Sequence, residues 1–325
     1  MIGISNTAWL DGKPLQPAAS TLAVLDSRTR RAPTFFEDER KVELTSTKPS
    51  DTDLQRSDGI GRIVLGGAER PLRIIDVFQK SPVRIMLPKL PGGEIEEAVL
   101  INTGGGIAGG DRLEYDVAAI QNASIAVSSQ AAEKLYRALD EPARIKTKLK
   151  VTGAAKLAWL PQETIVFNAA RICRNTEVEV SSGSELLALE WLVLGRAAYG
   201  EKMTAGHIAE SWRVKRDGRL IWADSFRVTD EMFGHIHRKA LLSQCKAIGT
   251  LIYFGPHLGA RLEFLRAIAS SLECYCAVTA VNGLIVVRFA TEASSDLSLA
   301  LRSFLKQFSR EFGSGPFRVP KMWSC

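Results

Sequence analysis

The sequence predicts a mainly β fold of layered, largely antiparallel sheets, arranged as a β-sandwich or as a β-helix-like stack. Short apolar segments with a period of two residues recur after Gly59, and turn signals separate them about every 8–12 residues. Segments with helical periodicity are few and lie mostly towards the C-terminus. The chain of 325 residues is therefore expected to be β-rich with a few helices.

The first 57 residues differ from the rest in composition. They are rich in Ser, Thr, Pro and charged residues, and they sustain no hydrophobic period. Such segments bury too little apolar surface to fold independently. We expect residues 1–57 to form a polar, disordered N-terminal tail and residues 58–325 to form one β-rich domain.

The expected strands begin directly after this segment. In residues 112–120, the apolar side chains of Leu113, Tyr115 and Val117 alternate with polar or small ones, which is typical of a half-buried strand. Further expected strands span residues 96–103, 123–129, 143–151, 155–160, 163–167, 176–182, 185–195 and 207–216. The pattern repeats often enough to predict at least two sheets.

Two β-hairpins are indicated by their turn dipeptides. Asp217-Gly218 and Asn282-Gly283 each stand between two apolar alternating segments. Both dipeptides readily adopt the positive φ angles that type I′ turns require. These two turns predict that the strands on either side of them pair antiparallel.

Four segments have helical spacing. Residues 257–272 and 294–308 place apolar residues three and four apart and are expected to be helices. Residues 237–248 carry a weaker helical pattern. Residues 128–139 could form one short helix, with Ser129 as its N-cap.

Composition and charge exclude several classes of protein. The net charge is +6 and the pI is about 9.1, but Lys and Arg are scattered, so no nucleic-acid interface is expected. No run of about 18 apolar residues could span a membrane, and the N-terminus lacks the pattern of a secretory signal. An odd, small number of cysteines favours reduced thiols, and we expect a cytoplasmic protein. These cysteines are Cys173, Cys245, Cys274, Cys276 and Cys325.

A glycine-rich loop follows the expected strand at 96–103. Residues 104–109 contain the spacing G-x-G-x-x-G, and Asp111 ends the loop. A dinucleotide site needs a helix directly after such a loop and an acidic residue about 20 residues on. Here the next segment alternates as a strand, which favours a tight loop with closely packed backbone. A functional loop presenting Asp111 is the other interpretation.

Two carboxylates stand in apolar surroundings. Glu190 lies within the continuous apolar run of residues 185–195, and Asp224 lies on the apolar face of the Asp217-Gly218 hairpin. Burying a carboxylate is costly unless a cation, a proton or water compensates it. Glu190 is therefore either an ion-pair partner of Arg196 or another arginine, or part of a ligand site or polar path. Asp224 is either salt-bridged or solvated, for instance through a β-bulge, or functional.

Weaker candidates are the pairs His235 and His237, and Cys274 and Cys276. Two histidines are too few for a closed metal site, and the cysteine pair fits buried small apolar residues better than a redox motif. No G-x-S-x-G, H-E-x-x-H or Walker A motif occurs. We therefore expect no enzymatic activity and assign no catalytic residues.

Six segments, in order, resemble signatures of the urease accessory protein D family, UreD, also called UreH. They are NTGGGIAGGDRL (102–113), SSQAAEKLYRA (128–138), WLPQETIVF (159–167), ALEWLVLGRAAYGE (188–201), RDGRLIWADSFRV (216–228) and VPKMW (319–323). Departures are the long segment before residue 57 and Gly104, where the family often has a different small residue. The resemblance extends over most of the chain after residue 70.

This resemblance implies a non-enzymatic, mainly β chaperone that inserts nickel into apo-urease. Its implied partners are apo-urease, the accessory protein UreF and the GTPase UreG. No cofactor is implied to bind tightly, and nickel is in transit along a path lined by Asp111, Glu190 and Asp224. The rival interpretations are a dinucleotide-binding enzyme using the glycine-rich loop and a passive scaffold without a metal path.

Overall fold

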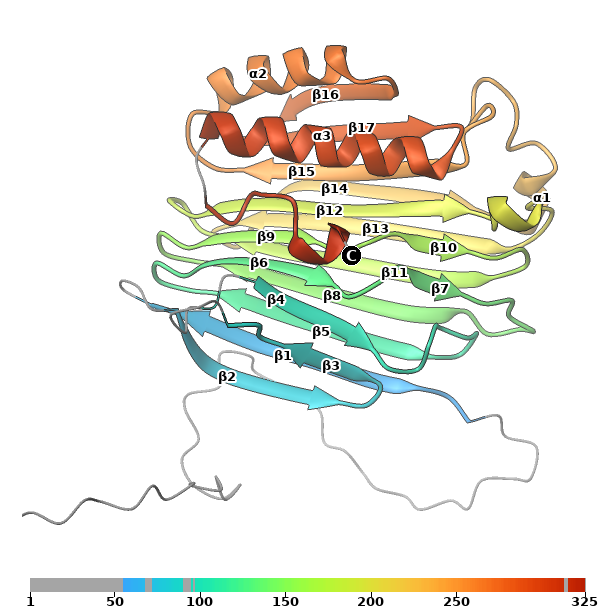
Figure 1. Cartoon of the computed structure of the whole chain (residues 1–325), viewed down its shortest axis with the longest axis horizontal. Helices are drawn as coiled ribbons and strands as arrows, with labels where there is room; N and C mark the ends of the chain where they lie inside the picture. The colour runs from blue at the N-terminus through green and yellow to red at the C-terminus, as the bar shows by residue number, and fades with distance from the viewer. Residues whose placement is uncertain (1–54, 68–71, 90–94, 96, 313–314, 325) are drawn as a thin grey trace, which may run out of the picture. The chain divides into compact units, whose positions relative to one another are not determined.

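The chain alternates between two facing β-sheets along most of its length (Figure 1). The computed structural model describes residues 55–324 except 68–71, 90–94, 96 and 313–314. Sheet A contains β1 (Asp58–Gly66), β2 (Arg73–Lys80), β5 (Arg112–Ala119), β8 (Ala143–Val151), β11 (Arg171–Val180), β13 (His207–Arg216) and β14 (Arg219–Val228). Sheet B contains β3 (Val83–Met86), β4 (Glu97–Asn102), β6 (Ser124–Ser129), β7 (Glu133–Leu135), β9 (Lys156–Leu160), β10 (Thr164–Val166), β12 (Glu185–Leu194), β15 (Ala247–Phe254), β16 (Tyr275–Val281) and β17 (Leu284–Thr291). The mainly β prediction is confirmed, and its β-helix-like form is the one adopted.

The central strands stack in parallel, which differs from the largely antiparallel pairing expected. β5, β8, β11 and β13 are successive parallel neighbours in sheet A, and β4, β6, β9 and β12 are parallel neighbours in sheet B. Between β4 and β13 the chain passes repeatedly from one sheet to the other and back, so it makes about four turns of a β-solenoid. A period of two residues identifies the faces of a strand but not the direction of its neighbour, which is why the antiparallel expectation was wrong for these strands.

Antiparallel pairing is kept for the ends of the solenoid and for the two predicted hairpins. β13 pairs with β14, and β16 pairs with β17. Asp217 and Gly218 have φ of 52° and 80°, and Asn282 and Gly283 have φ of 49° and 83°. Both hairpin predictions are confirmed, with the positive φ angles that they require.

Helices cover the outer face of sheet B. α2 (Leu258–Ser271) and α3 (Ser294–Phe312) confirm the two stronger helix predictions. α1 (Asp230–Phe233), η1 (Ala197–Tyr199) and η2 (Lys321–Ser324) are short. Neither α2 nor α3, the two long helices of the described chain, has an apolar stretch of the length that crossing a bilayer requires.

The two weaker helix predictions were wrong. Glu133 to Leu135 form β7 because they pair in parallel with β10, and Ser129 donates to the carbonyl of Ala131 instead of capping a helix. Residues 237–246 form turns, and β15 begins at Ala247. For Glu133 to Leu135, pairing with a neighbouring strand satisfies the backbone better than one or two isolated helical turns would.

β12 is buried on both faces, which explains its continuous apolar sequence. Its even-numbered residues, such as Leu186 and Leu192, face the interior between the sheets. Its odd-numbered residues, such as Leu189 and Trp191, pack with α3 and the C-terminal segment. The apolar stripe of α3, formed by Leu297, Leu301, Phe304, Leu305 and Phe308, is fully buried in the same cluster.

The expected tail, residues 1–57, lies outside the described residues up to position 54 and stays a prediction. Residues 58–324 form the solenoid and its helical cover, with the gaps given above. Cys173, Cys245, Cys274 and Cys276 are free thiols in the described chain. Cys325 lies outside it.

We predict that the C-terminal segment, which covers part of the outer face of sheet B, is required for a stable fold. Trp323 is 2% exposed, its ring lies 6.0 Å from that of Trp191, and its Nε1–H donates to the carbonyl of Leu160 at 3.1 Å. Trp323→Ala is expected to lower the free energy of unfolding by roughly 3–5 kcal/mol, the usual cost of removing a buried aromatic side chain. Urea denaturation measures this. Leu299→Ala, at an exposed position of α3, is the control and should change stability little.

Candidate functional site

A layer of polar side chains crosses the otherwise apolar interior between the two sheets. Along β11 the inward residues include Ile172, then Arg174 and Thr176, then Val178, so polar positions interrupt two apolar clusters. Because parallel strands hold these positions in register, the layer runs from strand to strand along the solenoid. Its members are Asn102, Tyr115, Ser129, Glu133, Thr147, Thr164, Arg174, Thr176, Glu190, Glu210, Asp224, Thr250 and Arg288.

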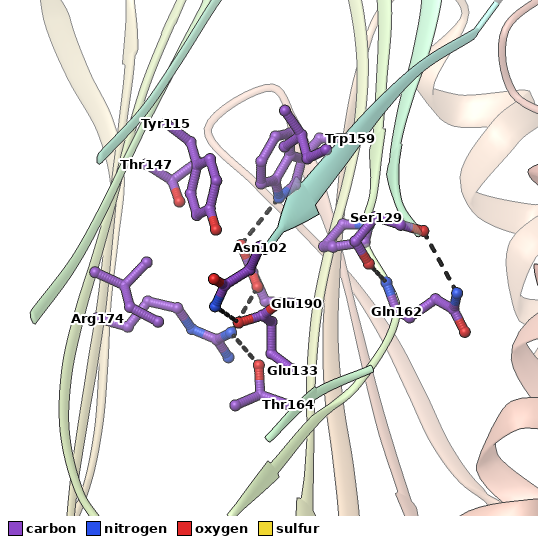
Figure 2. A pocket seen from close by; sticks show the side chains of 13 residues that line it. Asn102, Tyr115, Ser129, Glu133, Thr147, Trp159, Gln162, Thr164, Arg174 and Glu190 are labelled. Carbon is purple, nitrogen blue, oxygen red and sulfur yellow. Dashed lines mark hydrogen bonds and ion pairs between the residues drawn. The ribbon is translucent and has the colours of Figure 1, made fainter. Parts of the chain in front are cut away.

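Glu190 lies in the middle of this layer and is 5% exposed. Its Oε2 lies 2.8 Å from Nη1 of Arg174, and its Oε1 accepts a hydrogen bond from Nε1 of Trp159 at 2.9 Å (Figure 2). The other end of the Arg174 guanidinium contacts Glu210 on β13. Glu190 therefore forms an ion pair with an arginine, which is the first of its two interpretations. The arginine is Arg174 rather than Arg196.

Burial and charge act in opposite directions on this cluster. Burial raises the pKa of Glu190, while the nearby Arg174 and the hydrogen bond from Trp159 lower it. For Arg174, burial disfavours the charged form, but Glu190 and Glu210 outweigh it and its pKa is raised above the ordinary arginine value. Arg174 is thus a permanent cation held between two carboxyl groups inside the protein.

Asp224 faces the same interior. A bulge displaces the register between β13 and β14 next to Val214, on the turn side of Asp224, so it turns Leu220 outward and leaves Asp224 inward opposite Trp212. Oδ1 of Asp224 lies 2.7 Å from Nη2 of Arg288. The salt-bridged interpretation of Asp224 is therefore the one that the structure contains.

Two cavities lie along the polar layer. The smaller, of about 40 Å³, is lined in part by Glu133, Arg174 and Glu190 (Figure 2). The larger, of about 170 Å³, is lined in part by Glu190, Glu210 and Asp224. A water molecule needs on the order of 10–15 Å³ in a polar cavity, so both can be hydrated. Glu190 and Asp224 thus share one cavity, and Glu190 belongs to both.

Asp111 lies elsewhere and lines neither cavity. Its Oδ1 accepts from the backbone N–H of Ser57 at 2.8 Å and its Oδ2 from that of Ala108 at 2.7 Å. The carboxylate therefore closes the glycine-rich loop onto the chain that enters β1. Of the three carboxylates expected to line one path, Glu190 and Asp224 line one cavity and Asp111 does not, and a metal role for each of the three stays a prediction.

The glycine-rich loop is tightly packed and leads into a strand. A Cβ atom at Gly106 would lie 2.4 Å from the ring of Tyr136, and one at Gly109 would lie 2.6 Å from the carbonyl oxygen of Glu141. The next element is β5 rather than a helix, so this loop has no helix N-terminus to face a pyrophosphate. The close-packing interpretation is confirmed, and the dinucleotide-site interpretation is wrong.

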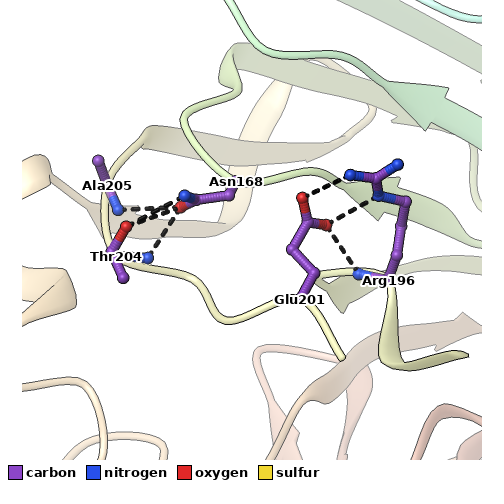
Figure 3. Close-up of polar contacts among 5 residues, drawn as sticks. All are labelled: Asn168, Arg196, Glu201, Thr204 and Ala205. Carbon is purple, nitrogen blue, oxygen red and sulfur yellow. Dashed lines mark hydrogen bonds and ion pairs between the residues drawn. The ribbon is translucent and has the colours of Figure 1, made fainter. Parts of the chain in front are cut away.

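The end of β12 is held by a separate polar contact that does not belong to the layer. Arg196 donates two side-chain hydrogen bonds to Glu201, at 2.9 and 3.1 Å, and Asn168 accepts from the backbone N–H groups of Thr204 and Ala205 (Figure 3). These bonds lower the pKa of Glu201. They fix the connection from β12 to β13, and hence the relative position of Glu190 and Glu210.

The weaker candidates do not meet to form a site. His235 and His237 are exposed near α1, and Cys274 and Cys276 are half-buried against the helical cluster. Burial raises the pKa of Cys276 to about 12, so it is an unreactive thiol. Among the described residues, no three His, Cys, Asp or Glu side chains are grouped so as to hold a metal ion.

Sequence reasoning missed Arg174, Glu210 and Arg288, although a signal was present. Glu210 stands between Ile208 and Trp212 on the same apolar alternation that singled out Asp224. Arg174 stands likewise between Ile172 and Thr176, and Arg288 between buried positions of β17. A search of the expected strands for charged residues at inward positions would have found all three.

The chain matches the profile of the UreD urease accessory protein family over residues 58–324. It is 37% identical over 270 residues to the urease accessory protein UreD of Xanthobacter autotrophicus. The aligned residues make up 83% of this chain and 91% of that relative. It is 35% identical over 272 residues to UreD of Azorhizobium caulinodans, with coverage of 83% and 98%. UreD of Methylobacterium sp. strain 4-46 is 34% identical over 286 residues, with coverage of 86% and 99%.

The family match covers the whole of this β-solenoid and defines a non-enzymatic accessory protein. The chain belongs to the UreD urease accessory protein family. This family functions in the maturation of urease, the nickel-related step in which accessory proteins act together. The resemblance in sequence and the expected lack of enzymatic activity are both confirmed by this membership.

We predict an opposite pH dependence for two glutamates. Burial raises the pKa of Glu133, against the hydrogen bond from Asn102. A raised pKa stabilises the fold at low pH, and this contribution is lost as the pH rises above 4.5 through the folded value. Glu133→Gln should therefore become more stable relative to the parent as the pH rises, measured as the melting temperature between pH 5 and pH 8.

Glu201 is the matched comparison for this test. Its pKa is lowered by Arg196, so its contribution is present above 4.5 and is lost as the pH falls. Glu201→Gln should therefore be less stable than the parent throughout the range from pH 5 to pH 8 and approach it only below pH 4.5, so its melting temperature is also measured in that acid range. Melting curves of the two variants that shift in the same direction with pH would contradict the assignment.

Proposed function

We propose that this chain inserts nickel during urease maturation by letting Ni²⁺ pass along the polar layer inside the solenoid. The observation that supports this is the shared 170 Å³ cavity of Glu190 and Asp224, two carboxylates that arise on different sheets. The route follows the stack of strands from the smaller cavity to the larger one. Asp224 and Arg288, which are partly exposed, mark the end nearest the surface.

The chemistry of the layer fits transport rather than storage. Ni²⁺ accepts oxygen, imidazole and thiolate ligands, and histidine or cysteine cages hold it tightly. The layer offers spaced carboxyl and hydroxyl groups with room for water instead. Four carboxyl groups, those of Glu133, Glu190, Glu210 and Asp224, face two guanidinium groups. When all are ionised the excess charge is negative, which attracts a divalent cation and disfavours anions.

The proposed partners follow from the family. The chain would bind apo-urease at one side and the accessory protein UreF at another, with the GTPase UreG supplying nickel through UreF. We place this assembly in the cytoplasm, where the free thiols of the described chain remain reduced. No resident cofactor is part of the proposal, because nickel is the cargo.

The experiment is coexpression of urease with its accessory proteins and variants of this chain. Glu190→Gln and Asp224→Asn keep the size of the side chains and an acceptor for Trp159 and Arg288, but they remove one charge each. We expect both to lower the nickel content of purified urease and its urea hydrolysis, and the double variant to lower them further. Nickel is measured by mass spectrometry, and pull-down of partners is measured in parallel.

Glu185→Gln is the matched control for this experiment. Glu185 lies on the same strand, is equally buried and pairs with Arg261 at 3.1 Å, but lines neither cavity. It should leave nickel insertion unchanged. If the double variant binds its partners and urease still receives its full nickel content, the chain is a passive scaffold. If the variants lose their partners, the carboxylates are structural.

A further inference from the structure

The guanidinium of Arg174 lies where the two cavities meet. Arg174 lines the smaller cavity, Glu210 lines the larger one, and Glu190 lines both. Nη1 of Arg174 is 2.8 Å from Glu190 and donates to Oγ1 of Thr164 at 3.1 Å, while Nη2 contacts Glu210. Figure 2 shows its side chain extending from sheet A towards Glu190 on sheet B. The guanidinium therefore lies between residues that line the smaller cavity and residues that line the larger one.

Arg174 takes the place that a bridging metal ion would take between these carboxyl groups. Glu190 belongs to β12 of sheet B and Glu210 to β13 of sheet A, so the cation joins the two sheets. Arg174 and Glu190 are both 5% exposed, and the side chain of Glu210 is 13% exposed. Two carboxyl groups so close together repel each other unless a cation lies between them. The position is thus built for a cation.

A second arginine in the protein shows what a purely structural pair looks like. Arg261 on α2 pairs with Glu185, which also accepts from the Tyr253 hydroxyl at 2.7 Å and lies 3.0 Å from Lys156. None of these four residues lines either of the two cavities described. Arg174 differs because it lines the smaller cavity itself, and its partners Glu190 and Glu210 line the larger one, so there is space for water beside this ion pair.

We propose that Glu190 and Glu210 form a latent divalent-cation site that Arg174 occupies, so that Arg174 sets how tightly the polar layer holds metal. This inference rests on the proposed nickel route for its purpose. A metal ion entering the site has to displace the guanidinium, and the returning guanidinium releases the metal. Arg174 thus competes with the metal ion for the two carboxyl groups and keeps them from binding it too tightly to release it.

The test is direct metal binding by the purified, tag-free chain. Arg174→Gln removes the cation and keeps a hydrogen-bond donor for Glu190. We expect this variant to bind one more Ni²⁺ per chain than the parent in equilibrium dialysis, or to bind it with a dissociation constant about tenfold lower. Arg174→Gln combined with Glu210→Gln should lose the gain. Arg261→Gln, the matched buried arginine, should show no gain.

Arg174→Lys keeps the test decisive if Arg174→Gln does not fold. A lysine is a point charge that pairs with one carboxyl group rather than bridging two, so its variant should bind Ni²⁺ more tightly than the parent. Unchanged nickel binding in the folded Arg174 variants overturns the inference. If the Arg174 variants gain nickel binding but the Glu190 and Asp224 double variant still activates urease fully, the latent site stands and the proposed nickel route fails. If the double variant loses activation but the Arg174 variants gain no nickel binding, the route stands and the latent site fails.

Discussion

The burial of charge inside an apolar solenoid is the constraint on which the rest of this structure depends. A carboxylate in such an interior needs a cation, a proton or water. Arg174 pairs with both Glu190 and Glu210, Arg288 pairs with Asp224, and burial favours a proton on Glu133. The cavities beside these groups leave room for water. The charges of the polar layer are therefore compensated, and the layer has room for water.

The solenoid converts this local arrangement into a continuous one. Parallel stacking places each residue beside its equivalent in the next turn, so a polar position repeated on successive strands becomes a row along the axis. Tyr115, Thr147, Thr176, Trp212 and Asp224 form such a row in sheet A. In a sandwich of antiparallel hairpins, an inward polar residue does not have to recur at the equivalent position of the next strand. The same stacking leaves the outer face of sheet B apolar, which is why α3 and the C-terminal segment cover it.

The sequence was sufficient for the class of fold, the two hairpins and the two long helices, because each has a local signal. It was not sufficient for strand direction, because alternation is the same in parallel and antiparallel sheets. Glu190 and Asp224 could be found as charges on inward positions. Their partners could not be chosen, since Arg174, Arg196 and Arg288 are equally plausible until the register of two sheets is known. Asp111 was grouped with them by resemblance, whereas its contacts are to loop backbone.

The pairs Glu190–Arg174 and Glu185–Arg261 show why burial and pairing do not by themselves indicate function. Both glutamates lie on β12, both are shielded from solvent, and each pairs with an arginine from another element of the fold. Glu185 is fully surrounded by Tyr253, Lys156 and Arg261, so its charge can only hold the helix α2 against sheet B. Glu190 shares its arginine with a second carboxylate and faces a cavity on either side. A paired charge can exchange its partner only where there is space for another cation. The cavities beside Glu190, which Glu185 lacks, therefore distinguish the two pairs.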